Sequence, residues 1–234
     1  MFYKNNHPCV PDLIHFIYPT NAMLHVLMNE SNGQVITIDD FITDEECDRL
    51  IELGGKQGYD RSTDVGKMKF DGTFEEKTSK TRTSHNAWCT EECYKDDLVQ
   101  NVLERIAEWT GIPDQNSEYL QLLKYETGQF YRAHHDYIEA DKNRQPGPRI
   151  LTAFLYLNDV PAGGGTNFPD LDLTVMPKRG RILLWPSVLD INPSEKNFST
   201  THQALDVEDG LKFGANAWIH LRDFKTPYDI DCTG

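Results

Sequence analysis

Two histidines and one aspartate in this 234-residue chain have the types and spacing of metal ligands. One residue separates His134 from Asp136, so in an extended strand both side chains point to one face while His135 points to the other. His202 completes a set of two imidazoles and one carboxylate, which is typical of non-haem Fe(II) centres with open coordination positions. Lys212, ten residues beyond His202, is placed to bind an anionic cosubstrate.

The run 210–221 has the pattern of a strand with two different faces. One face is apolar throughout, and the other combines a lysine, a tryptophan and a histidine. A half-buried strand with its polar face in water would not favour a tryptophan on that face, so the pattern predicts the wall of a pocket. The apolar face holds Phe213, Ala215, Ala217, Ile219 and Leu221, and the opposite face holds Lys212, Gly214, Asn216, Trp218 and His220.

A helix is expected near the N-terminal end of the folded region. It follows a predicted strand at 35–38, and its start is marked by Thr43 and Glu46, which form a capping-box pattern. Apolar residues then recur at helical spacing. Gly54-Gly55 is expected to end this helix, because glycine is a common stop signal.

A second helix is expected over 96–110, where the apolar stripe is closed by Gly111 and Pro113. The segment 56–80 between the two helices is polar and rich in Gly, Asp, Lys and Thr. It is too long for an idle connection, which leaves two alternatives: a functional lid or binding loop, or a disordered segment.

From residue 119 onward the pattern changes to short strands separated by turn residues. Helices followed by strands indicate an α+β protein, and we expect an antiparallel jelly roll with the N-terminal helices packed on one face. Residues 1–234 are expected to form one domain, with 1–33 as an N-terminal extension and 34–225 as the core. The expected strands cover 120–125, 131–137, 150–157, 181–185 and 212–221.

Several blocks of the sequence resemble, in order, those of the prolyl 4-hydroxylases within the 2-oxoglutarate/Fe(II) dioxygenase superfamily. Together they extend from about residue 35 to 225, and such an ordered series is far more specific than one H-x-D motif. The resemblance implies a double-stranded β-helix core, in agreement with the expected jelly roll. The blocks are DFITDEEC at 40–47, RTS at 82–84, QLLKY at 121–125, HHDY at 134–137, PRILT at 148–152, GGGTNFP at 163–169 and the run 202–220.

The resemblance also implies the cofactors. His134, Asp136 and His202 would bind Fe(II), and Asp136 argues against a halogenase, which leaves that ligand position free for a halide. The distal carboxylate of 2-oxoglutarate would accept a charge-assisted hydrogen bond from a lysine, with added hydroxyl contacts. L-ascorbate is expected to restore iron that is oxidised in uncoupled turnovers. The residues assigned to 2-oxoglutarate are Lys212, Tyr125 and Thr166.

A proline-rich or collagen-like peptide is the implied substrate. In polyproline II geometry its carbonyls are unpaired, so arginine donors and aromatic walls suit it. Glu118 must precede the strand at 120–125 or lie beside a bulge, because alternation would place it opposite Tyr125. Arg149 also fits an ordinary charge at a strand edge. The implied peptide-binding residues are Arg82, Ser84, Glu118, Tyr131, Arg149, Trp218 and His220.

The expected reaction is hydroxylation of peptidyl proline to 4-hydroxyproline by O2, with 2-oxoglutarate converted to succinate and CO2. Two alternatives stay open. One is an oxygenase of the same chemistry that acts on free proline or on another small or side-chain substrate, although Arg82, Arg149 and the 56–80 segment favour a peptide. The other is a catalytically silent jelly roll that binds peptides, against which the complete ligand set and Lys212 argue.

Composition restricts the partners and leaves the compartment open. A formal net charge of −14 opposes nucleic-acid binding, which depends on Lys and Arg to neutralise phosphates. No apolar run reaches the roughly 18 residues of a membrane span, and no secretory leader is visible. We expect a soluble protein, either cytoplasmic or in the secretory-pathway lumen if a leader has been removed.

The five cysteines do not follow a zinc-binding pattern. Cys89 and Cys93 are close enough in sequence to form a disulfide, which would stiffen the segment that follows RTS. Cys47 lies on the apolar side of the first predicted helix, so a buried free thiol is expected there. Cys9 and Cys232 have no evident partner.

Overall fold

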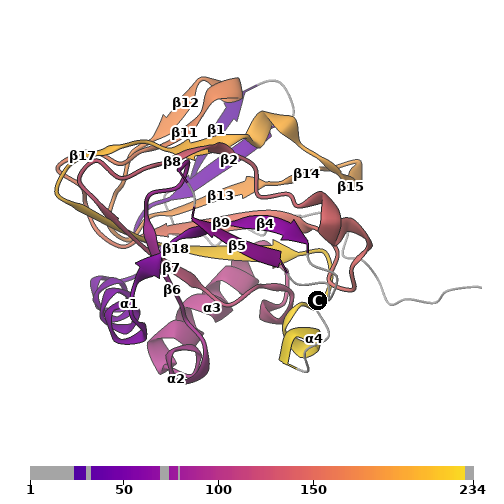
Figure 1. The fold of residues 1–234 in the computed structure, drawn as a ribbon, viewed down its shortest axis with the longest axis horizontal. Helices are drawn as coiled ribbons and strands as arrows, with labels where there is room; N and C mark the ends of the chain where they lie inside the picture. The colour runs from indigo at the N-terminus through magenta and orange to yellow at the C-terminus, as the bar shows by residue number, and fades with distance from the viewer. Residues whose placement is uncertain (1–23, 30–32, 69–73, 79, 230–234) are drawn as a thin grey trace, which may run out of the picture.

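The structure is a computed structural model that describes residues 24–29, 33–68, 74–78 and 80–229 (Figure 1). The helices are α1 (Asp44–Gln57), α2 (Glu91–Tyr94), α3 (Asp97–Thr110) and α4 (Lys225–Asp229), with 3-10 turns η1 (Asp114–Asn116), η2 (Glu139–Asn143), η3 (Pro169–Leu171) and η4 (Phe198–Thr200). The strands are β1 (Leu24–Asn29), β2 (Gly33–Ile38), β3 (Asp60–Arg61), β4 (Thr63–Met68), β5 (Phe74–Thr78), β6 (His85–Trp88), β7 (Gln121–Glu126), β8 (Tyr131–His134), β9 (Arg149–Tyr156), β10 (Ala162–Gly163), β11 (Thr166–Phe168), β12 (Leu173–Val175), β13 (Ile182–Pro186), β14 (Val188–Leu189), β15 (Asn192–Lys196), β16 (His202–Ala204), β17 (Val207–Asp209) and β18 (Leu211–His220).

Two antiparallel sheets form the body of the described residues. The large sheet has the strand order β1-β2-β13-β9-β18-β7-β6-β3, and the small sheet has the order β12-β11-β16-β8. Figure 1 shows α1 and α3 on the lower side of the large sheet and the small sheet on its upper side. This α+β jelly roll confirms the predicted fold class. β1 pairs with β2 along its whole length, so residues 24–29 of the expected extension belong to the large sheet.

Each face of the large sheet has its own apolar core, because successive side chains of a strand point to opposite faces. On the helix side, residues of β9 and β18 pack against α1 and α3; on the other side, a second cluster lies towards the small sheet. The first cluster includes Cys47, Leu50, Leu53, Val99, Val102, Leu103, Ile106, Leu151, Ala153, Leu155, Ala215, Ala217 and Ile219. The second includes Leu123, Tyr125, Phe154, Tyr156, Phe168, Leu183, Trp185 and Val207.

The sequence signals for helix starts are confirmed for α1 and α3. Thr43 and Glu46 form the predicted capping box of α1, and Asp96 accepts a hydrogen bond from the Leu98 N–H at the start of α3. The predicted end of α1 at Gly54-Gly55 is wrong, because the helix continues to Gln57. Gly54 is inside the helix for a packing reason: a Cβ there would lie 2.1 Å from the Tyr59 hydroxyl oxygen.

One other prediction needs correction. The strand expected over 131–137 ends at His134, and Asp136 lies in a bend beyond it. Of the two alternatives for the segment 56–80, a lid or binding loop and a disordered segment, the structure is at odds with the second, since the described part contains β3, β4 and β5, with β4 and β5 paired as a hairpin. The remaining expected strands at 35–38, 120–125, 150–157, 181–185 and 212–221 are confirmed to within two residues at each end.

Cysteine pairing follows the local spacing. Cys89 and Cys93 form a disulfide, as the sequence suggested, and both residues are buried. Cys47 is a buried free thiol, and burial raises its pKa to about 11, which suppresses thiolate chemistry. Cys9 and Cys232 lie outside the described residues. Within the described part of the chain, no helix is long and apolar enough to cross a membrane.

Candidate active site

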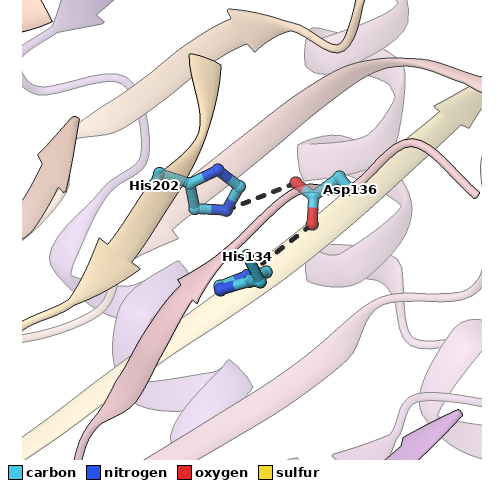
Figure 2. Close-up of side chains that lie close together, drawn as sticks. All are labelled: His134, Asp136 and His202. Atoms are coloured by element: carbon cyan, nitrogen blue, oxygen red, sulfur yellow. Dashed lines mark ion pairs between the residues drawn. The ribbon is translucent and has the colours of Figure 1, made fainter. Parts of the chain in front are cut away.

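The H-x-D pair and the distant histidine meet between the two sheets. Ligating atoms of His134, Asp136 and His202 all lie within 4.8 Å of one another. Figure 2 shows the Asp136 carboxylate facing both imidazoles, with His134 at the end of β8 and His202 on β16. The two histidines are register partners across the β8–β16 pair. Strand pairing therefore joins positions separated by 68 residues of sequence.

Both imidazoles are oriented by the backbone. The Nδ1 atom of His134 lies 2.9 Å from the Arg132 carbonyl oxygen, and that of His202 lies 2.9 Å from the Thr200 carbonyl oxygen. A carbonyl can only accept, so each Nδ1 carries a proton and each Nε2 is the ring nitrogen left to face a metal. Burial, the largest effect, lowers the pKa of His134 to about 3 and keeps this imidazole neutral.

The carboxylate of Asp136 is buried but remains ionised. Its Oδ1 is 3.9 Å from His134 Nε2, and its Oδ2 is 3.6 Å from His202 Nε2. Burial acts to raise the pKa of Asp136, but the neighbouring imidazoles, Arg149 and the Thr152 hydroxyl outweigh it and bring the pKa to about 2. Two imidazoles and one carboxylate on one side of a pocket fit Fe(II), which accepts nitrogen and oxygen ligands and needs open positions for its substrates.

Lys212 is buried in a cage of aromatic rings, with only 1% of its surface exposed. Its Nζ lies 5.2 to 5.5 Å from the ring centres of Tyr125, Phe154 and Tyr156 and donates a hydrogen bond of 2.6 Å to the Gly164 carbonyl. Gly164 has a φ of 70°, a conformation that glycine adopts without strain. Burial lowers the pKa of Lys212 to about 7, so an anionic ligand would restore the full positive charge.

The predicted cosubstrate residues gather around this lysine. Tyr125 pairs with Lys212 in register across β7 and β18, and both line the same pocket as Thr166. Sequence reasoning missed Tyr156, a fully buried residue whose hydroxyl donates to Thr166 Oγ1 at 2.7 Å. Every second residue of β9 from Thr152 to Tyr156 faces the pocket side. The hydroxyl groups of Thr152 and Tyr156, which share this strand face, were the sequence signal that could have revealed both residues.

Three of the predicted peptide-binding residues form one buried polar cluster. Glu118 accepts hydrogen bonds from Arg149 Nε at 2.5 Å and from His220 Nε2 at 2.9 Å. Glu118 precedes β7, as required if it was to share the site with Tyr125. The Arg149 guanidinium stacks over Trp218 at 3.9 Å, so Arg149 is not a simple strand-edge charge. His220 is held from its other side by the Gly147 carbonyl, 2.7 Å from Nδ1.

The remaining predicted contacts surround Arg82. Its Nη2 donates to Gln121 at 2.6 Å, its Nε to Ser84 Oγ at 3.3 Å, and its guanidinium lies 4.8 Å from the Tyr131 ring centre. Tyr131 in turn stacks on His134 at a centroid distance of 3.5 Å, next to the candidate metal ligands. His135 points away from the ligand set, as predicted, with Nε2 2.7 Å from the Asn197 carbonyl oxygen.

One pocket joins most of these side chains. Ser84, Glu118, Arg149 and His220 do not line it and instead support residues that do. The predicted residues that line the pocket are Arg82, Tyr125, Tyr131, His134, Asp136, Thr166, His202, Lys212 and Trp218. The pocket thus brings a candidate metal centre, a buried cation and an aromatic wall together.

Comparison with known proteins assigns the class. The sequence model of a family described as the 2OG-Fe(II) oxygenase superfamily matches residues 120–220, which include the whole ligand set and Lys212. Probable prolyl 4-hydroxylase 6 of Arabidopsis thaliana is 34% identical over 79% of this chain and 68% of its own length. Prolyl 4-hydroxylase 2 of the same plant is 33% identical over 87% of this chain and 73% of its own length.

The same fold occurs in solved structures. The 2OG complex of the viral collagen prolyl hydroxylase vCPH from Paramecium Bursaria Chlorella virus-1 matches with a TM-score of 0.63 and 24% identity, covering 83% of this chain and 98% of that chain. The chain therefore belongs to the prolyl 4-hydroxylase family of 2-oxoglutarate- and Fe(II)-dependent dioxygenases. Fe(II) and 2-oxoglutarate are the metal and the cosubstrate of this enzyme class.

Proposed function

We propose that this protein hydroxylates peptidyl proline to 4-hydroxyproline, using O2 and 2-oxoglutarate and releasing succinate and CO2. His134, Asp136 and His202 would hold Fe(II), and Lys212 would hold the distal carboxylate of 2-oxoglutarate, aided by Tyr125 and Thr166. When bound, the iron and 2-oxoglutarate supply the activation of O2 and the oxidation of the substrate. The relatives named as prolyl 4-hydroxylases support proline as the target.

The observation that favours a peptide is the unused donor on Trp218. Its indole Nε1 is buried and has no hydrogen-bond acceptor among the described residues, although the side chain lines the pocket. A buried donor without a partner is costly, so a ligand oxygen is expected to accept from it. The unpaired carbonyls of a polyproline II chain meet this need.

The protein's own residues orient the reactants and exclude water. The hydrogen-bonded backbone carbonyls hold both imidazoles with Nε2 towards the metal position, and Thr152 holds Asp136. Aromatic rings around Lys212 remove competing water from the cosubstrate carboxylate. On the substrate side, Glu118 keeps Arg149 stacked on Trp218, which fixes the wall against which the peptide would lie.

Mass spectrometry of a proline-rich peptide panel would test this function directly. The peptides are incubated in air with protein, Fe(II), 2-oxoglutarate and ascorbate, and His202→Ala and Lys212→Ala proteins run in parallel. We expect a gain of one oxygen on proline that is lost in His202→Ala. In Lys212→Ala we expect recovery only at about 10- to 100-fold more 2-oxoglutarate, the range for a lost charged hydrogen bond.

The other outcomes separate the alternatives. Succinate formation without peptide oxidation would keep the oxygenase and reject the peptide substrate in favour of free proline or another small or side-chain substrate. Iron-loaded protein that forms neither product would support a silent peptide-binding module. Omitting ascorbate should shorten the linear phase of succinate release, because ascorbate is expected to restore iron oxidised in uncoupled turnovers.

A further inference from the structure

A tryptophan outside the assigned site stands on the same face of the large sheet as the pocket. Trp88 ends β6 and pairs with Gln121 of β7, which pairs with Asn216 of β18. Residues directly opposite each other on neighbouring strands point to the same face. Asn216 lines the pocket, so Trp88 faces the pocket side of the sheet, whereas its neighbour Ala87 is buried and opposes Leu122 of the helix-side core.

Trp88 extends the aromatic wall of the pocket to the surface. Its ring lies 6.1 Å from that of Trp218, with an angle of 51° between the planes. Trp218 is only 6% exposed, whereas Trp88 is 40% exposed. Tryptophan is enriched at binding surfaces, where a rigid ring gains much contact area, so a half-exposed indole continuous with the proposed substrate wall points to a ligand.

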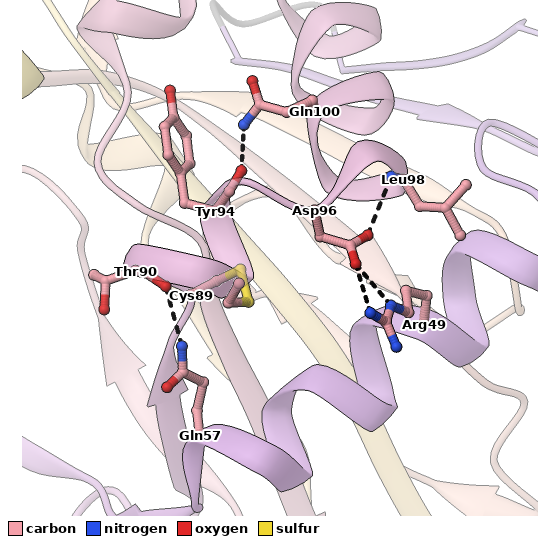
Figure 3. The surroundings of a disulfide bond; sticks show 9 residues. Arg49, Gln57, Cys89, Thr90, Tyr94, Asp96, Leu98 and Gln100 are labelled. Atoms are coloured by element: carbon pink, nitrogen blue, oxygen red, sulfur yellow. Dashed lines mark hydrogen bonds and ion pairs between the residues drawn. A yellow bond between two sulfur atoms is a disulfide. The ribbon is translucent and has the colours of Figure 1, made fainter.

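Trp88 is held in place from behind. The Cys89 N–H donates to the Leu120 carbonyl at 2.9 Å, and Cys89 is linked by the disulfide to Cys93 of α2. Figure 3 shows Gln57, at the end of α1, reaching the Thr90 carbonyl next to this disulfide, at 3.1 Å. A ring fixed before binding loses little conformational entropy when a ligand packs on it.

We propose that Trp88 forms an outer subsite that packs against a proline flanking the target proline in the peptide substrate. This inference rests on the proposed function. A polyproline II chain rises by about 3.1 Å per residue with three residues per turn, so successive prolines face three directions around the chain. The two indole rings lie 6.1 Å apart with an angle of 51° between their planes, so a chain whose target proline lies against Trp218 would bring a neighbouring proline against Trp88.

The test compares two peptides in steady-state kinetics. One is a short peptide with a single target proline, and the other is a long peptide of consecutive prolines. For Trp88→Ala we expect the KM of the long peptide to rise about 3- to 10-fold with an unchanged kcat, the range for one lost aromatic contact. The kinetics of the short peptide should not change, and Trp88→Phe should fall between the wild type and Trp88→Ala.

Ile191→Ala is the matched control, because Ile191 is another exposed apolar side chain, at the turn between β14 and β15. It should leave both peptides unaffected. An unchanged KM for the long peptide in Trp88→Ala would overturn the subsite, and so would an equal loss for both peptides, which indicates a structural role. If the wild type oxidises neither peptide, the proposed function itself is rejected and the subsite with it.

Discussion

The hydroxyl of Thr152 donates a hydrogen bond of 2.7 Å to Asp136 Oδ2, and both side chains are buried. This bond fixes the rotation of the carboxylate, with Oδ2 turned towards His202 and Oδ1 towards His134. Thr152 is on β9, a central strand of the large sheet, so the bond ties a residue in a bend to the middle of that sheet. Partners of this kind orient metal ligands and tune their affinity.

Replacing Thr152 by Val should therefore weaken metal binding without a large change in shape. We expect the Kd for Co(II), a spectroscopic substitute for Fe(II), to rise about 10-fold or more. Thr152→Ser keeps the hydroxyl and should remain near the wild type. Titration followed by the visible Co(II) absorption measures this independently of turnover, and equal Kd values for the Val variant and the wild type would refute the role of Thr152.

The depressed pKa of Lys212 predicts a pH dependence of 2-oxoglutarate binding. Burial lowers this pKa to about 7, so the free protein loses the ammonium charge as the pH rises through 7. Below that pH the charge is already present and affinity should be flat. Above it, binding must take up a proton, and the Kd should rise by up to about tenfold per pH unit. Tyr125 and Tyr156 stay neutral there, because burial raises both their pKa values.

Calorimetry of 2-oxoglutarate binding to metal-loaded protein without O2, between pH 6 and 9, provides the measurement. In buffers of different ionisation enthalpy, the heat should reveal uptake of about one proton at pH 8. Lys212→Arg is the control, because a guanidinium stays charged throughout and should flatten the profile. His134, with a pKa of about 3, and Asp136, at about 2, do not titrate in this window. A pH-independent Kd in the wild type would contradict the prediction.

Breaking the buried Glu118–Arg149 ion pair should lower both the stability of the protein and its affinity for the peptide. Glu118→Gln would leave the Arg149 guanidinium buried without its counter-charge, which typically costs about 3–5 kcal/mol. We expect a lower Tm and a higher KM for the peptide. Glu92→Gln breaks the exposed Lys95–Glu92 pair and should leave the Tm unchanged. If Glu118→Gln and Glu92→Gln had the same Tm, the polar cluster around Glu118 would not stabilise the fold.

Local signals in the sequence were sufficient for the helix starts and the faces of β18. The capping box at Thr43 and the alternation from Lys212 to His220 depend on residues only a few positions apart. The ligand set was also recoverable, since the family motif fixes His134, Asp136 and His202. What places Asp136, however, is not the strand alternation expected over 131–137.

Beyond His134, β8 has no strand partner among the described residues, and the chain bends to bring Asp136 to the pocket. Where a strand loses its partner depends on a segment far away in sequence, so local periodicity cannot show it. The same limit explains why Thr152 and Tyr156 were missed. Each gains its role from a contact across the pocket, to Asp136 and Thr166 respectively, so the polar alternation along β9 marks the two positions without showing their partners.

The incorrectly predicted end of α1 leads to a stability prediction for two neighbouring glycines. Alanine substitutions at Gly54 and Gly55 should change the free energy of unfolding in opposite directions. A Cβ at Gly54 would lie 2.1 Å from the Tyr59 hydroxyl oxygen and 2.6 Å from its ring carbon, whereas a Cβ at Gly55 would meet nothing within 4 Å. Gly55→Ala should stabilise the protein by about 0.5–1 kcal/mol, the helix preference of alanine over glycine.

Gly54→Ala should destabilise it by about 1–3 kcal/mol, since Tyr59, which packs against the helix-side core, must move. Denaturant unfolding of the two single variants decides the point. Two stabilised variants would mean that Tyr59 yields easily and that Gly54 is dispensable. Opposite signs would show that the packing of Tyr59 requires a residue without a side chain at position 54. Gly54 would then be present for packing, and the Gly-Gly pair would not act as a helix stop signal.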